Sequence, residues 1–257
     1  MTLHYQLDGP EGAPVVVFAN SLGTTLSLWE PQMAALTRYF RVLRYDTHGH
    51  GQTRKTGPVT LAQLGGDVLS LLDKLDIARA HFCGISMGGL TGLWLARFAP
   101  QRFISVTIAN SAAKIGDQAG WAARARTVRE EGMAAVAAGA AQRWFSEAFR
   151  RQAPQSVLPL IHQLAQSDAA GYAACCEAIG EADLRAEVQH ITLPLLVLAG
   201  EHDPVTTVAD GEFIRQQAPG AQLVVLPASH LSNAEAPQAF NDALLTFLRS
   251  QEERHAG

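Results

Sequence analysis

The chain contains a serine, an aspartate and a histidine, in that order, which are the residue types that together perform acyl transfer: Ser86, Asp203 and His230. A serine hydroxyl is a poor nucleophile at neutral pH unless a histidine takes its proton, and a carboxylate must orient that histidine. Each of the three follows a short apolar run typical of a strand, and the interval between Asp203 and His230 fits one helix and one strand. The pattern predicts a Ser-His-Asp triad that attacks a carboxylic ester or a related carbonyl compound.

The surroundings of Ser86 meet the demands of a nucleophile elbow, a sharp turn between a strand and a helix. The sequence "ARAHFCGI" predicts the strand, and a helical pattern begins at Met87. The turn requires small flanking residues because a Cβ there would collide with its neighbours, and the chain supplies Gly84, Gly88 and Gly89.

Acyl transfer also requires an oxyanion hole, which is a pair of N–H groups aimed at the developing negative oxygen. The Met87 N–H, directly after the nucleophile, is the first candidate. The second is the Leu22 N–H, in the loop Asn20–Thr25 that follows another predicted strand. Gly23 in that loop allows the backbone to approach closely.

Apolar runs alternate with helical patterns over most of the chain. The predicted strands are 15–20, 40–46, 78–85, 103–110, 193–203 and 221–230, and the predicted helices among them include 60–77, 208–219 and 236–251. Such alternation predicts an α/β fold, with a mostly parallel central sheet and helices on both faces. The alternation lapses between residues 111 and 190, which are alanine-rich and helical in pattern. We therefore expect a core formed by residues 1–110 and 191–257, with an inserted helical cap over 111–190.

Composition narrows the class of protein. The net charge of −4 gives no basic surplus for nucleic acid or an acidic membrane. No apolar run is long enough to span a bilayer, and the first residues resemble no signal peptide. Three cysteines form no disulfide framework, so we expect a cytoplasmic protein. The "HGH" at 48–50 indicates loop structure rather than a metal site, and no cofactor is expected.

With these parts in place, the chain resembles the α/β-hydrolase superfamily over essentially its full length. The segments "YDTHGHGQT" and "SHLSNAEAP" are similar to the family's D-x-x-G-x-G-x-S segment and its histidine loop. The oxyanion loop departs from the usual His-Gly-x-Gly. Its "NSLGT", followed by Trp29, together with "GISMGG" and "LAGEHDPVT", resembles the 3-oxoadipate enol-lactonases.

This resemblance implies hydrolysis of the enol-lactone 4,5-dihydro-5-oxofuran-2-acetate to 3-oxoadipate, in bacterial breakdown of protocatechuate and catechol. It implies that Ser86 attacks the lactone carbonyl, His230 takes its proton and Asp203 orients the imidazole. The N–H groups of Leu22 and Met87 would hold the oxyanion. Neither metal nor organic cofactor is implied, and the only partner expected is the small lactone.

The implied substrate carries a carboxylate, so a cationic side chain of the cap is expected to face it. The candidates are Arg124, Arg126 and Arg143, with Trp121 and Trp144 as pocket walls. Beside the oxyanion loop, Ser21 is a further candidate polar contact.

Other functions on the same framework stay open at this point. A carboxylesterase, a cofactor-free perhydrolase and a carbon–carbon bond hydrolase would all use the same triad, and so would a small-molecule receptor that has lost turnover. Epoxide hydrolases and haloalkane dehalogenases are disfavoured, because their nucleophile is an aspartate whereas this elbow carries Ser86. The oligomeric state does not follow from these patterns.

Overall fold

Seven strands form one sheet in the computed structural model, which describes residues 3–54 and 57–256. The ends of the predicted core, residues 1–2 and 257, lie outside the described residues. In chain order the strands are β1 (Tyr5–Asp8), β2 (Val15–Ala19), β3 (Arg41–Tyr45), β4 (Ala80–Ile85), β5 (Phe103–Ala109), β6 (Leu195–Gly200) and β7 (Gln222–Leu226). Their order across the sheet is β1-β3-β2-β4-β5-β6-β7; β1 pairs antiparallel with β3, and the other pairs are parallel.

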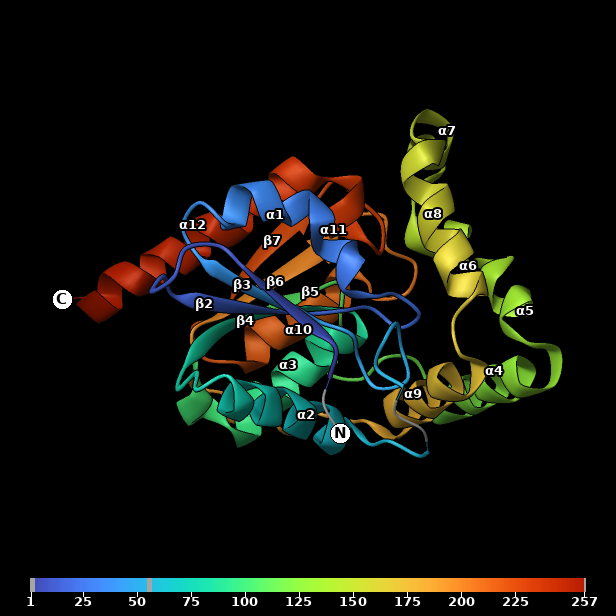
Figure 1. Ribbon diagram of the computed structural model, residues 1–257, viewed down its shortest axis with the longest axis horizontal. Helices are drawn as coiled ribbons and strands as arrows, with labels where there is room; N and C mark the ends of the chain where they lie inside the picture. The colour runs from blue at the N-terminus through green and yellow to red at the C-terminus, as the bar shows by residue number, and fades with distance from the viewer. Residues whose placement is uncertain (1–2, 55–56, 257) are drawn as a thin grey trace.

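Helices cover both faces of this sheet (Figure 1). One face packs against α1 (Glu30–Leu36) and α12 (Pro237–Ala256), and the other against α2 (Leu61–Lys74), α3 (Met87–Phe98) and α10 (Val208–Gln217). Short helices flank these elements: η1 (Leu26–Trp29), η2 (Pro100–Arg102), η3 (Val188–His190) and α11 (Ser232–Glu235). The predicted α/β class, with a mostly parallel sheet and helices on both faces, is confirmed.

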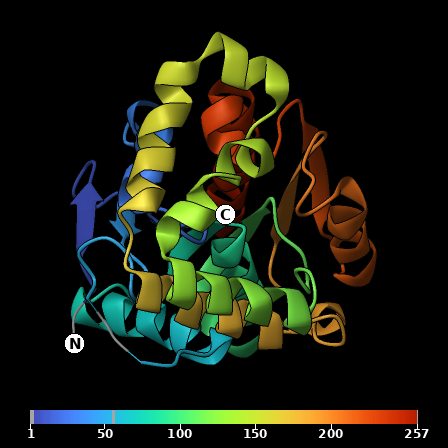
Figure 2. The same cartoon turned by 90° about the vertical axis from the view of Figure 1, so that its right-hand side faces the viewer.

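Six further helices separate β5 from β6. They are α4 (Gln118–Glu131), α5 (Met133–Ala137), α6 (Ala140–Trp144), α7 (Glu147–Gln152), α8 (Pro154–Ala165) and α9 (Ala169–Glu181). Figure 1 shows them as a group beside the sheet, and Figure 2 shows α4 and α9 lying along one another. No strand lies between β5 and β6 in the part of the chain that the structure describes. The division into a core and a cap with its own role stays a prediction.

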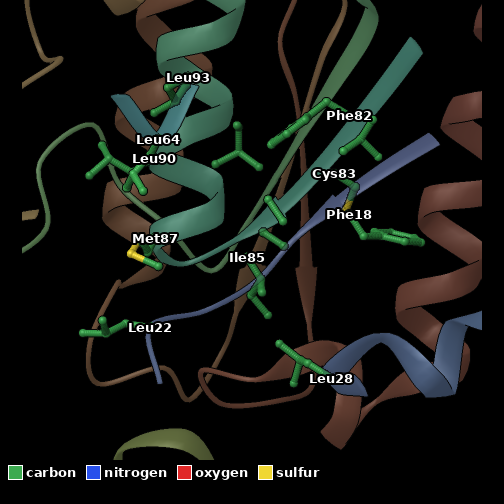
Figure 3. Close-up of a cluster of buried hydrophobic side chains, with 14 of the residues drawn as sticks. Phe18, Leu22, Leu28, Leu64, Phe82, Cys83, Ile85, Met87, Leu90 and Leu93 are labelled. Atoms are coloured by element: carbon green, nitrogen blue, oxygen red, sulfur yellow. The ribbon is translucent and has the colours of Figure 1, made fainter. Parts of the chain in front are cut away.

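The apolar core lies directly beneath the carboxyl ends of the central strands. Figure 3 shows buried side chains on both sides of these strands. Phe82 of β4 and Leu90 of α3 lie on the side that α3 covers, and Phe18 of β2 and Ile85 of β4 lie on the opposite side, where Phe18 stacks on Trp29 of η1. All five are fully buried, and burial of such a side chain stabilises the fold by roughly 1.5–3 kcal/mol. This packing fixes the strand ends from which the candidate catalytic residues project.

Parallel strands place their carboxyl ends at one edge of a sheet. β2, β4, β6 and β7 run parallel, so the segments that follow them meet at that edge. Among the described helices, none combines the length and the apolar character that a membrane crossing requires.

Candidate active site

Ser86 occupies a strained turn between β4 and α3. Its φ of 56° and ψ of −116° lie where non-glycine residues are rarely found, and such strain persists only when the surroundings enforce it. The Ser86 N–H donates to the Ala109 carbonyl at 2.9 Å, and the Ser111 hydroxyl donates to the Ser86 carbonyl at 2.7 Å. The end of β5 thus holds the turn on both sides.

The three glycines around Ser86 allow the close approach that this turn requires. A Cβ on Gly84 would lie 2.0 Å from the Gly88 carbonyl oxygen, and one on Gly88 would lie 2.2 Å from the Ala19 carbonyl oxygen. A Cβ on Gly89 would lie 2.5 Å from the Ser111 Cβ. Backbone atoms cannot move aside as a flexible side chain can, so the elbow and the loop after β2 are packed through glycine.

Gly88→Ala is expected to lower the free energy of unfolding by roughly 1–3 kcal/mol, because overpacking at this contact must push β2 and the elbow apart. Denaturant unfolding measures the change. Gly66→Ala is the matched control: it also lies in a helix, and a Cβ there has nothing within 4 Å, so it should stabilise the protein by about 0.5–1 kcal/mol. Equal stability of the two variants would contradict the tight packing of the elbow.

The candidate triad residues lie within hydrogen-bonding distance of one another. His230 Nε2 lies 2.9 Å from Ser86 Oγ, and His230 Nδ1 lies 2.8 Å from Asp203 Oδ2. All three side chains are buried, with 7, 3 and 6% of Ser86, His230 and Asp203 exposed. A histidine so placed can accept the serine proton at Nε2 while its Nδ1–H donates to the carboxylate.

Asp203 accepts hydrogen bonds at both of its oxygens. The Val205 and Thr206 N–H groups donate to Oδ1 at 2.8 and 3.1 Å, and the Thr206 hydroxyl and Asn110 Nδ2 donate to Oδ2 at 2.9 and 3.0 Å. Burial raises the pKa of Asp203, but the charge of His230 and these hydrogen bonds outweigh it, and the net effect lowers this pKa. The side chain therefore stays a carboxylate at neutral pH.

Sequence analysis did not identify Asn110 in this arrangement. Asn110 follows β5, has a φ of 43° and also donates to the Ser229 carbonyl at 3.0 Å. It therefore ties Asp203 to the loop that carries His230. Its place after a parallel strand at the same edge of the sheet is the signal that could have indicated it.

The Leu22 and Met87 N–H groups are the two predicted donors of the oxyanion hole. The Gly88 N–H donates to the Asn20 carbonyl at 3.1 Å, which locks the loop after β2 against the elbow. Within the described residues, neither the Leu22 nor the Met87 N–H donates to a protein acceptor. Both residues lie at the same end of the central strands in Figure 3.

The unusual asparagine of this loop has a structural explanation. Asn20 Oδ1 accepts from the Trp29 indole at 2.9 Å, and Asn20 Nδ2 donates to the Tyr45 carbonyl at 2.7 Å. Both side chains are fully buried, so this network fixes where the oxyanion loop leaves β2. The co-occurrence of "NSLGT" and Trp29 in the sequence therefore reflects a direct contact.

The Ser86 hydroxyl borders a small cavity that adjoins a larger one. The inner cavity, of about 30 Å³, is lined by Ser21, Leu22, Ser86, Trp121, Arg124, Arg143, Trp144, Tyr172, Val205 and His230. The outer cavity, of about 320 Å³, shares Trp121, Arg124, Arg143 and Val205 with it. Together they lead from the outside, between α4 and α6, to the nucleophile.

Five of the six candidate substrate contacts line the inner cavity: Ser21, Trp121, Arg124, Arg143 and Trp144. Arg126 does not: it is exposed and lines neither cavity. Two residues along a helix correspond to a rotation of roughly 200°, so Arg124 and Arg126 cannot face one pocket from α4. Tyr172 and Val205, which sequence analysis did not single out, complete the lining.

The two cavity arginines are placed to bind an anion. The Arg124 guanidinium lies 4.8 Å from the centre of the Trp121 ring, and Arg143 donates to the Val136 carbonyl at 3.0 Å. Burial and the charge of Arg124 lower the pKa of Arg143. No carboxylate among residues 3–54 and 57–256 forms an ion pair with either arginine. A bound anion would relieve their mutual repulsion.

Comparison with known proteins agrees with the fold. The model of the alpha/beta hydrolase fold family matches residues 14–237, most of the chain. The chain therefore belongs to the α/β-hydrolase family.

Within this family, particular relatives are similar over nearly the whole chain. A 3-oxoadipate enol-lactonase of Acinetobacter baylyi is 51% identical over 250 residues, covering 97% of this chain and 94% of the relative. A second enol-lactonase of that organism is 49% identical, with the same shares covered. The crystal structure of an enol-lactonase from Burkholderia xenovorans superimposes with a TM-score of 0.94 at 47% identity, covering 96% of each chain.

Proposed function

We propose that this chain hydrolyses 3-oxoadipate enol-lactone to 3-oxoadipate, in bacterial breakdown of protocatechuate and catechol. The observation that carries the proposal is a hydrogen-bonded Ser86–His230–Asp203 set that opens into a cavity lined by two arginines. Sequence identity of about half to 3-oxoadipate enol-lactonases supports the choice of substrate.

In the first step Ser86 Oγ attacks the lactone carbonyl carbon while His230 Nε2 takes the hydroxyl proton. The carbonyl oxygen becomes an oxyanion between the Leu22 and Met87 N–H groups, each of which contributes roughly 3–4 kcal/mol in comparable hydrolases. The ring C–O bond then breaks, and the electron pair leaves as an enolate. An enolate is an easy leaving group, and it tautomerises to the ketone when it takes a proton from His230.

In the second step water replaces the departed oxygen. His230, neutral again, takes a proton from a water molecule that attacks the acyl carbon on Ser86. A second tetrahedral oxyanion forms in the same hole, and its collapse releases the new carboxylate and returns the proton to Ser86. Asp203 stays ionised throughout and stabilises the imidazolium.

We assign the substrate carboxylate to Arg124 and Arg143. The inner cavity of about 30 Å³ is much smaller than the outer cavity of about 320 Å³, so a lactone bound at Ser86 must extend into the outer one. Both arginines lie where these cavities join. Trp121, Trp144 and Tyr172 supply apolar walls against the ring.

Arg124→Gln and Arg143→Gln are each expected to raise KM for the lactone by about 10- to 100-fold, the loss of a charge-assisted hydrogen bond worth roughly 1.5–3 kcal/mol. The value of kcat should change less, because the carboxylate lies away from the reacting carbonyl. Initial-rate kinetics measures both constants. Arg126→Gln makes the same change on the exposed side of α4 and should match the wild type. Unchanged KM in both cavity variants would rule out this assignment.

The function itself is tested by following the loss of ultraviolet absorbance of the enol-lactone. Rapid hydrolysis, with kcat/KM in the upper part of the ordinary range of roughly 10⁴–10⁸ M⁻¹s⁻¹, is the expected result. Slow turnover of the lactone with rapid turnover of simple aryl esters would contradict the proposal and leave a carboxylesterase.

We also propose a reducing compartment, the cytoplasm, as the place of action. Cys83, Cys175 and Cys176 are all free and buried. Burial raises the pKa of each thiol, which keeps these cysteines in the unreactive protonated form.

A further inference from the structure

A buried histidine outside the triad contacts the oxyanion loop. His50 lies in the turn after β3 and is 2% exposed. Its Nε2 accepts a hydrogen bond from the Gly23 N–H at 2.9 Å, and its Nδ1 lies 2.9 Å from the His48 carbonyl oxygen. Gly23 directly follows Leu22, whose N–H is one of the two proposed oxyanion donors.

The loop that carries this donor is a tight turn. The Thr24 N–H donates to the Ser21 carbonyl at 3.2 Å, and Gly23 has a φ of +79°. These are the features of a type II β-turn with Ser21 as its first residue and glycine in the third place. A Cβ on Gly23 would also lie 2.4 Å from the Leu164 side chain of α8, so glycine is required there twice over.

Two successive peptide groups of the turn are held by different partners. The Ser21 carbonyl accepts from the Thr24 N–H and from the Thr24 hydroxyl at 2.8 Å. The Leu22 N–H belongs to the same trans peptide as this carbonyl and points the opposite way, so its direction depends on the form of the turn that these bonds close. The next peptide, which joins Leu22 to Gly23, is held through the Gly23 N–H by His50 alone among the described residues.

That second peptide is the mobile part of such a turn. Types I and II differ by rotation of the central peptide, with the dihedral angles on either side of it changing by roughly 150–170°. Glycine allows both forms without steric cost. An acceptor on the Gly23 N–H therefore selects the type II form. Rotation to the type I form would change the ψ angle of Leu22, the residue that carries the proposed oxyanion donor.

Only one form of the imidazole satisfies both contacts of His50. The His48 carbonyl can only accept, so Nδ1 must carry the proton, and Nε2 then accepts from Gly23 as a neutral ring nitrogen. Burial lowers the pKa of His50, opposed in part by the bond to the His48 carbonyl and by the charges of Asp46 and Asp168.

The inserted helices enclose this histidine. The Tyr172 ring of α9 lies 6.5 Å from the His50 ring, and the Cys175 thiol of α9 donates to the His48 carbonyl at 3.5 Å. A Cβ on Gly49 would lie 2.4 Å from the Gly171 Cα, so the turn and α9 touch through backbone. His50 is thus held between α9 and the oxyanion loop with little freedom to turn away.

We propose that His50 is a positioning residue for the oxyanion hole: its Nε2 holds the Gly23 N–H and so keeps the Leu22 N–H aimed at the developing oxyanion. This inference rests on the proposed acyl chemistry at Ser86. His50 itself does not touch the substrate, since it lines neither cavity. Removal of the His50 side chain is therefore expected to weaken stabilisation of the transition state and to leave substrate binding nearly unchanged.

The test compares His50→Phe with His50→Gln. Phenylalanine keeps the ring packed against Tyr172 but offers no acceptor, whereas the glutamine amide oxygen can reach the place of Nε2. We expect His50→Phe to lower kcat by about 10- to 100-fold, part of the 10²–10³ that a complete oxyanion donor supplies, with KM changed less than about 3-fold. His50→Gln should regain most of the rate. His48→Gln is the matched control, because it changes a neighbouring buried histidine whose Nε2 bonds to the Gly57 carbonyl.

A second measurement separates this inference from the choice of substrate. An uncharged p-nitrophenyl alkylphosphonate places its phosphoryl oxygen in the oxyanion hole when it labels Ser86, so its labelling rate should fall in His50→Phe and recover in His50→Gln. Normal labelling of the wild type without lactone turnover would contradict the proposed substrate and leave the His50 comparison valid. Equal kcat and equal labelling in His50→Phe and the wild type would overturn the role of His50. A wild type that neither opens the lactone nor takes up the phosphonate would overturn both.

The hydrogen bond itself is also measurable. In ¹⁵N-labelled wild-type protein, His50 should show the neutral Nδ1–H form, with a scalar coupling between Gly23 N and His50 Nε2. The opposite tautomer would overturn the proposal even if the His50→Phe variant fails to fold.

Discussion

Ser86→Ala is expected to lower kcat for the lactone by about 10⁵- to 10⁶-fold, since loss of the nucleophile in a comparable triad hydrolase costs about this much. The residual rate comes from water attack in a site that still has its oxyanion donors and binding contacts. KM should change little, because the hydroxyl is small and the cavity walls remain. Stopped-flow absorbance measures the wild type, and long incubations at high enzyme concentration measure the variant.

The chain offers a matched control for this substitution. Ser105 on β5 also bonds to a histidine, with its Oγ 2.8 Å from His81 Nδ1, and His81 Nε2 lies 2.8 Å from a Glu252 oxygen. In this second Ser-His-Glu set Ser105 and His81 are fully buried and Glu252 is half-buried, and none of the three borders either of the two cavities that lead to Ser86. Ser105→Ala is therefore expected to keep kcat. A Ser86→Ala variant that retains more than about a hundredth of the wild-type rate would contradict nucleophilic catalysis by this serine.

The contrast between these two sets explains why sequence reasoning reached the candidate triad. Ser86, Asp203 and His230 each follow a parallel strand, so topology alone brings them to one edge of the sheet. The five central strands, β2 to β6, follow from their continuous apolar runs, because they are buried on both faces.

Other elements gave weaker signals. β1 was not predicted, because it is a short edge strand whose side chains are alternately exposed and half-buried, without the apolar run of the central strands. Arg126 was grouped with Arg124 because composition and spacing do not reveal which side of α4 faces the pocket. The side of a helix that faces a pocket is known only when the elements that pack against the helix are known.

The groups that support the site were the hardest to predict. Asn110 and His50 act through contacts with residues 93 and 27 positions away in sequence. Neither contact follows from a motif, because each depends on how two loops meet after folding. His50 was interpreted as part of a structural loop, which is where it lies, but its bond to Gly23 connects that loop to the proposed chemistry.

Asp203→Asn is expected to lower kcat by about 10⁴-fold, the cost of the same change in another Ser-His-Asp enzyme. In this protein the surroundings of Asp203 dictate the outcome. Val205 and Thr206 N–H groups both donate to Oδ1, so the asparagine oxygen must take that place. Its NH₂ group then faces His230 Nδ1 and donates to it, which moves the imidazole proton to Nε2. His230 can no longer accept the Ser86 proton.

A matched control lies on the loop that carries His230. Glu235 accepts from the Ser229 N–H at 3.0 Å and makes no contact with the imidazole, so Glu235→Gln exchanges a carboxylate for an amide without changing the tautomer of His230. It is expected to stay within about 3-fold of the wild-type kcat, since it leaves the triad charges intact.

Asp203→Asn also has an effect on stability. The new NH₂ group faces Asn110 Nδ2, so two donors meet where the wild type has a donor and an acceptor. Its free energy of unfolding should therefore fall by roughly 1–3 kcal/mol, the cost of buried polar groups left unpaired. If Asp203→Asn keeps the wild-type kcat, the hydrogen bond between His230 and Asp203 is not the one that orients the base.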